Sequence, residues 1–178
     1  MKTFQTPQIY VGTYKKYNEG SLFGEWLDLT DYDTYDEFYS QCQELHNDED
    51  DIELMFQEWE NIPDKFISEC HLDKKVYDYI EAIYEMDNNI EAFNHYLNNW
   101  GTNIDKDFSE ILEGFESAYQ GYFEGDTEVK FTYFYVESND ILSGISEDLQ
   151  FYFDYQKYAR DLFITDYVEY EGHVFIRD

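Results

Sequence analysis

The chain has 178 residues, of which 43% are hydrophobic and 21% aromatic; this composition excludes a disordered polypeptide and suits one compact domain or two to three small ones. Forty-one Asp and Glu residues face eleven Lys and Arg, so the net charge is −30, which makes nucleic acid and anionic membrane poor partners and a strongly basic surface a good one. Two unpaired thiols, the lack of an apolar leader and the lack of a membrane-length apolar run predict a cytoplasmic protein with no membrane association.

The first third of the chain predicts a small three-stranded antiparallel sheet. Residues 8–14 and 21–29 are β-prone and are separated by a turn signal at residues 17–20, and residues 51–60 alternate as a third strand. Gly24 lies inside the second of these segments, where a glycine predicts a bulge or a close backbone approach.

One helix is predicted between the second and third strands. Thr34 and Glu37 form a T-x-x-E capping box at its start. The apolar residues of its inner face follow at helical spacing, and they are Phe38, Cys42 and Leu45.

The remainder predicts helices at residues 73–86, 89–99, 107–119 and 154–167, and a closing strand at 172–177. The aromatic run 131–136, FTYFYV, favours a strand by propensity but fits a helix nearly as well.

Predicted domain boundaries at Pro63 and near Asn103 divide these elements into three small domains of an α+β protein. The predicted domains are 1–62, a sheet with one helix; 63–103, short helices; and 104–178, a second α+β domain. The charge excess is spread through the chain, because residues 1–61 carry 15 acidic and 3 basic side chains, residues 62–103 carry 8 and 3, and residues 104–178 carry 18 and 5.

The sequence disfavours both a zinc site and a calcium site. Cys42 and His46 lie four residues apart on a predicted helix, but with Cys70 and His71 they match no standard zinc spacing, and a partly buried cysteine with surface histidines is the better interpretation. Residues 31–36 resemble the start of a calcium-binding loop without its required glycine.

Catalysis is also disfavoured. Among 41 acids some pair of carboxylates is always close together, so proximity has no diagnostic value. The chain contains no nucleophile elbow, phosphate-binding glycine loop or Ser/His/Asp order. The sequence therefore predicts a binding protein that is not an enzyme and has no cofactor, with a metal-dependent enzyme as the weakest alternative.

Two interpretations of the whole surface remain. A halophilic protein also carries many acids, although that does not account for 19 tyrosines. The other interpretation is imitation of a polyanion: DNA carries one charge per about 1.7 Å of axis, so thirty uncompensated carboxylates correspond to the phosphates of about 15 base pairs.

Several stretches resemble the ArdA antirestriction proteins. They are 9–29, IYVGTYKKYNEGSLFGEWLDL; 36–63, DEFYSQCQELHNDEDDIELMFQEWENIP; 115–121, FESAYQG; 153–167, FDYQKYARDLFITDY; and 172–177, GHVFIR. Together they cover most of the chain in the order of the family.

The resemblance implies a DNA mimic, encoded on plasmids and conjugative transposons, that occupies the DNA-binding groove of type I restriction–modification enzymes. It also implies an elongated row of three small domains, a helix at 131–138, a homodimer joined through the C-terminal domain, and no catalytic residues. A generic acidic module that sequesters other basic DNA-binding proteins is the alternative function.

Under this interpretation, carboxylates throughout the chain stand in for phosphates. The candidates are Glu25, Asp28, Asp31, Asp33, Asp36, Glu37, Asp48, Glu49, Asp50, Asp51, Glu58, Glu60, Asp78, Glu81, Glu85, Glu110, Glu113 and Glu116.

Overall fold

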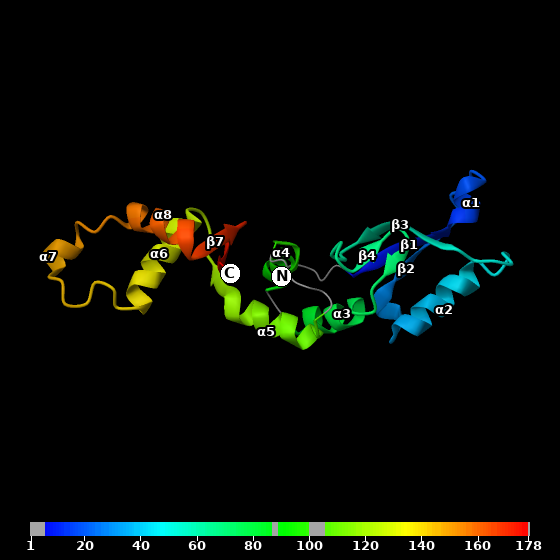
Figure 1. The fold of residues 1–178 in the computed structure, drawn as a ribbon, viewed down its shortest axis with the longest axis horizontal. Helices are drawn as coiled ribbons and strands as arrows, with labels where there is room; N and C mark the ends of the chain where they lie inside the picture. Colours follow the sequence, from blue (N-terminus) through cyan, green and yellow to red (C-terminus); the bar gives the residue numbers. More distant parts are fainter. Residues whose placement is uncertain (1–5, 87–88, 100–105, 178) are drawn as a thin grey trace. The chain divides into compact units, whose positions relative to one another are not determined.

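The computed structural model describes residues 6–86, 89–99 and 106–177, and it confirms the α+β class. The chain divides into two compact units, a first unit of Met1–Phe108 and a second unit of Ser109–Asp178 (Figure 1). The division lies close to the predicted boundary at 103/104, whereas the predicted boundary at 62/63 falls inside the first unit. The three-domain arrangement therefore stays a prediction.

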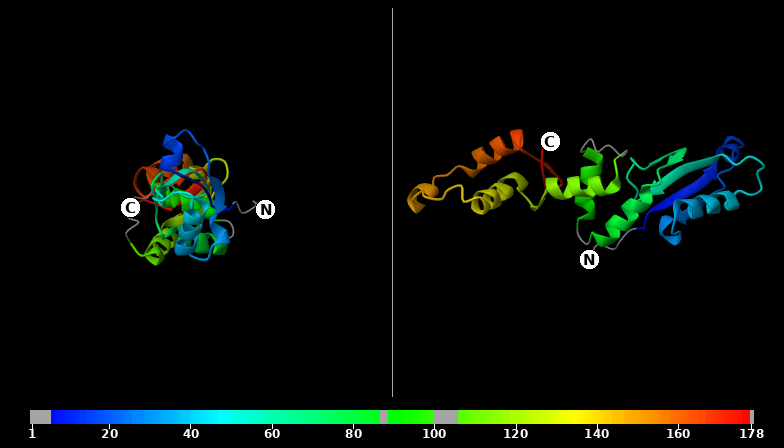
Figure 2. Two further views of the ribbon diagram at one scale, coloured as in Figure 1. Left: turned by 90° about the vertical axis from the view of Figure 1, so that its right-hand side faces the viewer. Right: turned by 60° about the horizontal axis from the view of Figure 1, so that its bottom comes forward.

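The first unit contains the predicted three-stranded antiparallel sheet. Strand β1 (Gln8–Thr13) lies between β2 (Glu25–Asp28) and β3 (Leu54–Glu60). Helix α2 (Tyr35–Leu45) runs beside this sheet in both Figure 1 and Figure 2. The core contains apolar residues from all four elements, namely Ile9, Val11, Leu27, Phe38, Cys42 and Phe56.

Gly24 makes the predicted close approach. A Cβ atom at this position would lie 2.5 Å from the carbonyl oxygen of Val11, which is far too close for a side chain. The segment between β1 and β2 differs from the prediction, because Tyr14 begins the short helix α1 (Tyr14–Asn18) instead of ending the strand. The side chain of Thr13 caps this helix by accepting from the backbone N–H of Lys16.

The predicted cap of α2 forms with one difference. Thr34 Oγ1 accepts from the backbone N–H of Glu37 at 3.3 Å, as the motif requires. Glu37 Oε2 then accepts from the backbone N–H of Asp33, at 3.0 Å, and so reaches one residue further back than in the standard capping box.

The rest of the first unit is mainly helical. It contains η1 (Leu29–Asp31), a two-residue hairpin of β4 (Ile67–Ser68) and β5 (His71–Leu72), α3 (Val76–Glu85) and α4 (Ile90–Asn99). The hairpin was not predicted. Tyr79 of α3 and Phe93 of α4 are buried, and their rings stack with centroids 6.2 Å apart. The Tyr79 hydroxyl donates a hydrogen bond to Asn94 Oδ1.

The second unit contains nearly all of α5 (Phe108–Ala118) and the short helix α7 (Glu147–Gln150), and its helices α6 (Thr127–Ser138) and α8 (Tyr155–Thr165) lie beside a sheet. Its sheet has the order β6-β8-β7, with β6 (Tyr119–Tyr122), β7 (Tyr167–Tyr170) and β8 (His173–Ile176). The closing strand was predicted, and β6 and β7 were not. The aromatic run 131–136 is helical, as the family resemblance implied.

Phe131 of α6 is the centre of this core. It is 1% exposed, and its ring packs against the rings of Phe163 on α8 and Tyr167 on β7. The distances between the ring centroids are 5.6 and 4.6 Å. Aspartates begin both helices: Asp126 accepts from the Val129 backbone N–H, and Asp154 accepts from that of Lys157. Among the described residues, no helix combines the length and apolar character needed to cross a membrane.

Candidate functional site

The predicted carboxylates lie mainly on the surface. Sixteen of the eighteen are exposed, Asp28 is half-buried and Glu49 is buried. The exposed ones are Glu25, Asp31, Asp33, Asp36, Glu37, Asp48, Asp50, Asp51, Glu58, Glu60, Asp78, Glu81, Glu85, Glu110, Glu113 and Glu116. Asp28 is half-buried because it receives hydrogen bonds from the backbone N–H and hydroxyl of Thr30, at 2.8 and 2.6 Å.

The outer face of α2 brings several acids together. Asp36, Glu37 and Glu44 line a shallow depression together with Tyr32, Ser40 and Gln41. Glu44 was not among the predicted site residues, although it lies seven residues after Glu37 and so follows it on the same helical face.

Lys74 contacts the edge of this α2 surface. Its ammonium lies 3.5 Å from Asp36 Oδ1, and the two side chains are 70% and 85% exposed. Such a solvated ion pair contributes little to stability and leaves the Asp36 carboxylate open to a partner.

Helices α3 and α5 each carry a row of predicted acids opposite their buried face. On α3 the buried residues include Tyr79 and Ile83, while Asp78, Glu81 and Glu85 are exposed. On α5, Ile111 and Phe115 are buried, while Glu110, Glu113 and Glu116 are exposed. Residues three or four apart on a helix have Cβ atoms about 5–6 Å from each other, so each row presents closely spaced charges.

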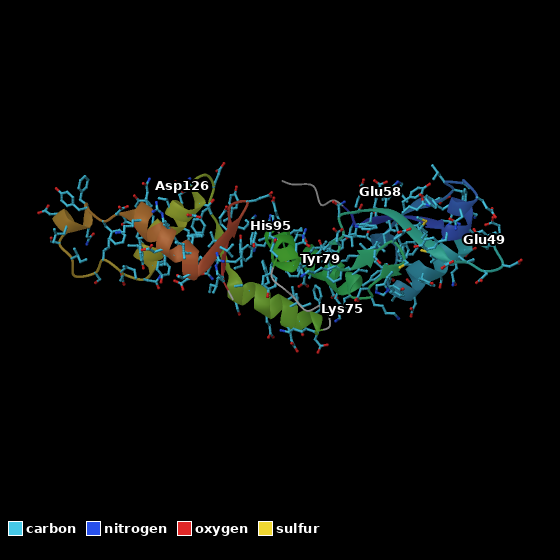
Figure 3. All side chains as sticks on the ribbon, turned by 45° about the horizontal axis from the view of Figure 1, so that its top comes forward. Glu49, Glu58, Lys75, Tyr79, His95 and Asp126 are labelled. Atoms are coloured by element: carbon cyan, nitrogen blue, oxygen red, sulfur yellow. The ribbon has the colours of Figure 1, made fainter. Side chains whose placement is uncertain are left out.

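On β3, Glu58 and Glu60 point to the side of the sheet away from the core. Glu58 is paired with Tyr10 of β1, and Glu60 with Gln8. Figure 3 labels Glu58 on the first unit and Asp126 on the second, so exposed carboxylates occur on both units.

The run of acids after α2 forms a turn, residues 46–51, which we call the acidic turn. Asp48, Asp50 and Asp51 are exposed there, whereas the side chain of Glu49 is only 3% exposed. Glu49 Oε1 accepts a hydrogen bond of 2.7 Å from Thr13 Oγ1 and lies 3.5 Å from Lys16 Nζ. Glu49 is therefore tied to the interior, and we leave it out of the proposed binding surface.

His46 begins the acidic turn and is fully buried, so the prediction of surface histidines is wrong here and correct for the exposed His71. Its Nε2 lies 3.3 Å from the carbonyl oxygen of Val11, and its Nδ1 lies 3.0 Å from Lys16 Nζ. The carbonyl can only accept and the ammonium can only donate, so these partners fix the neutral Nε2–H tautomer.

The electrostatics of His46 agree with this assignment. Burial lowers the pKa of His46 below its ordinary value, and the adjacent Lys16 ammonium lowers it further, against the opposing effect of the hydrogen bond with Val11. The hydrogen bond from Lys16 likewise lowers the pKa of Asp48.

Donor atoms of His46, Asp48 and Glu49 lie within 4.8 Å of one another, a geometry that resembles a metal site. The cation that this cluster holds is the Lys16 ammonium, which lies 2.7 Å from Asp48 Oδ1. Lys16 and Thr13 were not predicted as site residues, because their contacts with the acidic turn span 30 to 36 residues and leave no local pattern in the sequence.

The cysteines do not belong to this cluster. Cys42 is buried in the α2 core, and burial raises the pKa of its thiol to about 12. Cys70 is exposed in the turn between β4 and β5.

The second unit also has a run of exposed apolar side chains, which we call the apolar segment. Its members are Ile141, Ile145, Leu149, Phe151 and Tyr152, the last two being 84% and 79% exposed.

Comparison with known proteins places the chain in a family. The model of the antirestriction protein family ArdA matches residues 9–176, nearly the whole chain. No curated protein matches at a significant level. Since the match extends over both compact units, this chain belongs to the ArdA family of antirestriction proteins.

Proposed function

We propose that this protein is a DNA mimic that occupies the DNA-binding groove of a type I restriction–modification enzyme and so protects incoming mobile DNA in the cytoplasm. Membership of the ArdA family implies an antirestriction function. The observation that best supports mimicry as its mechanism is the exposure of sixteen of the eighteen predicted carboxylates, twelve of them on helices or strands, with members in both units.

The negative charge of the chain as a whole cannot be neutralised internally. With 41 acidic and 11 basic residues, thirty carboxylates stay uncompensated even if every Lys and Arg forms an ion pair. A groove lined with Lys and Arg attracts such a surface by the electrostatics that hold DNA, and this attraction weakens as salt rises.

Order in the charged surface favours tight binding. The acids of α2, α3 and α5 lie on helices whose opposite faces are buried. A rigid ligand loses less conformational entropy on docking than a flexible polyanion does. The proposed action therefore needs only binding, with no chemical step.

We also propose that the protein is a homodimer that associates through the second unit. The apolar segment supports this, because Phe151 and Tyr152 are almost fully exposed to water and lie against each other, and large exposed apolar groups of this kind often mark a protein interface. A second copy of the chain is the proposed occupant.

The test is competition with DNA. A purified type I methyltransferase core would be bound to fluorescent DNA that contains its unmodified recognition site, and this protein would then be titrated in at several salt concentrations. We expect displacement at stoichiometric protein, with an apparent affinity that falls as salt rises. Unchanged DNA binding at large excess would contradict the proposal.

A panel of unrelated basic DNA-binding proteins serves as the control. Equal displacement from every member would favour the alternative, a generic acidic module. Displacement confined to the restriction–modification enzyme would show that shape as well as charge is recognised.

A further inference from the structure

We propose that Lys16 is a positioning residue that holds the acidic turn, residues 46–51, in one conformation and so fixes where Asp48, Asp50 and Asp51 present their charges. This inference rests on the proposed function, and it identifies an internal cation on which the order of the binding surface depends.

One ammonium group contacts three side chains of the same turn. Lys16 Nζ lies 2.7 Å from Asp48 Oδ1, 3.0 Å from His46 Nδ1 and 3.5 Å from Glu49 Oε1. It also lies 4.6 Å from the centre of the Phe23 ring, which covers it from another side. The Lys16 side chain is 14% exposed, so solvent and salt screen these contacts less than the surface pair of Lys74 and Asp36.

Glu49 depends on this cation. Thr13 donates to its Oε1, but Oε2 is buried and accepts no hydrogen bond from the described residues. A buried carboxylate without a compensating charge is strongly unfavourable. Loss of Lys16 would therefore drive Glu49 toward water, and its chain neighbours Asp48 and Asp50 would move with it.

The cluster is joined to the sheet on its other side. His46 bonds to the carbonyl of Val11 in β1, and the backbone N–H of Glu49 donates to the carbonyl of His46 at 3.0 Å. The turn, which follows α2, is thus joined to strand β1 through Val11 and Thr13 and to helix α1 through Lys16.

Two explanations of the attraction to the groove predict opposite results when Lys16 is removed. One depends on the net charge alone, and the other depends on the fixed positions of the carboxylates. Lys16→Met removes one cation from a net charge of −30 and gives −31. Attraction by total charge alone would then be unchanged or stronger. If Lys16 orders the turn, attraction to the groove becomes weaker although the protein is more acidic.

Lys15→Met is the matched control. Lys15 is the preceding residue of α1, is exposed, and gives the same net charge of −31 when replaced. In the competition assay we expect Lys15→Met to match the wild type or exceed it slightly, and Lys16→Met to displace DNA about threefold to tenfold less well, as for the loss of a few ordered charges. Lys16→Arg should restore part of the loss.

Two further measurements separate ordering from misfolding. Hydrogen exchange should be faster in Lys16→Met at the amides of residues 46–51 and unchanged in the core of β1. The double variant Lys16→Met, Glu49→Gln removes the unpaired buried charge, keeps the net charge at −30, and should fold while still displacing DNA less well than the wild type.

Equal displacement by folded Lys16→Met and Lys15→Met would overturn the inference, as would unchanged exchange in the acidic turn. Failure of the wild type itself to displace DNA would instead refute the proposed function, so the two failures are distinguishable.

Discussion

Nε2 of His46 lies 3.3 Å from the carbonyl oxygen of Val11, and this hydrogen bond joins the acidic turn to the central strand of the first unit. The imidazole is completely buried, and it must stay neutral to accept from Lys16 at its other nitrogen. The stability of the turn is therefore coupled to pH.

His46→Gln should destabilise the protein by about 1–3 kcal/mol at pH 7.5, the usual cost of losing buried hydrogen bonds. The pKa of His46 is lowered in the folded state, so the unfolded chain binds the extra proton first as pH falls. The stability that His46 contributes is present above the unfolded pKa of 6.5 and is lost as pH falls through the lower folded value. The free-energy difference between wild type and variant, measured by urea unfolding, should therefore shrink from pH 7.5 to pH 5.5. A constant difference would refute this coupling, since other titrating groups are common to both proteins.

The two thiols should react at very different rates. Cys70 is exposed, whereas Cys42 is buried and has a pKa of about 12. With a chromogenic disulfide reagent at pH 7.5, we expect one rapid thiol per chain and a second only after unfolding. Cys70→Ser should abolish the rapid phase. A rapid phase that persists in this variant would mean that the α2 core opens readily.

Binding charge should be shared among many acids. Asp50→Asn should change the apparent affinity for the methyltransferase core by less than about twofold, because one exposed charge at an interface rim contributes little. The triple variant Asp78→Asn, Glu81→Gln, Glu85→Gln should weaken displacement by about tenfold and flatten its salt dependence. These side chains are exposed on α3, so circular dichroism should be unchanged. A triple variant as effective as the wild type would exclude this row from the interface.

Phe131 should be critical for the second unit. Phe131→Ala removes a 1% exposed ring from contacts with Phe163 and Tyr167 and should cost about 3–5 kcal/mol. Phe134 lies on the same helix and is 49% exposed, so Phe134→Ala should cost much less. Thermal unfolding of both variants makes the comparison, and similar losses would contradict the assigned core.

Replacing Leu149, Phe151 and Tyr152 with serine should convert the proposed dimer into a monomer. These residues belong to the apolar segment of the second unit, and their burial would supply the hydrophobic part of the interface. Light scattering coupled to gel filtration measures the mass. Leu22→Ser is the control, because Leu22 is 70% exposed on the first unit. A triple variant that stays dimeric would place the interface elsewhere.

Features encoded by neighbouring residues were predictable from the sequence. The cap at Thr34, the inner face of α2 and the close approach at Gly24 each depend on a local pattern or on the absence of a side chain. The short strands β4 to β7 were missed because they have two to four residues each and are defined by tertiary pairing.

The interior of the acidic turn could not be predicted for a similar reason. The interactions that bury His46 and Glu49 come from Val11, Thr13 and Lys16, which are 30 or more residues away. In the aromatic run of α6, tertiary packing overrides the preference of the local sequence. Its propensity favoured a strand, but packing of Phe131 against α8 and β7 stabilises a helix.

Asp126 and Asp154 begin α6 and α8 by accepting backbone hydrogen bonds through their side chains. Asparagine caps a helix about as well as aspartate does. Exchange between these two residue types would therefore change the electrostatic potential of the second unit while its helices keep their starting points. Evolution can thus adjust how strongly this protein adheres to a target and leave its architecture intact.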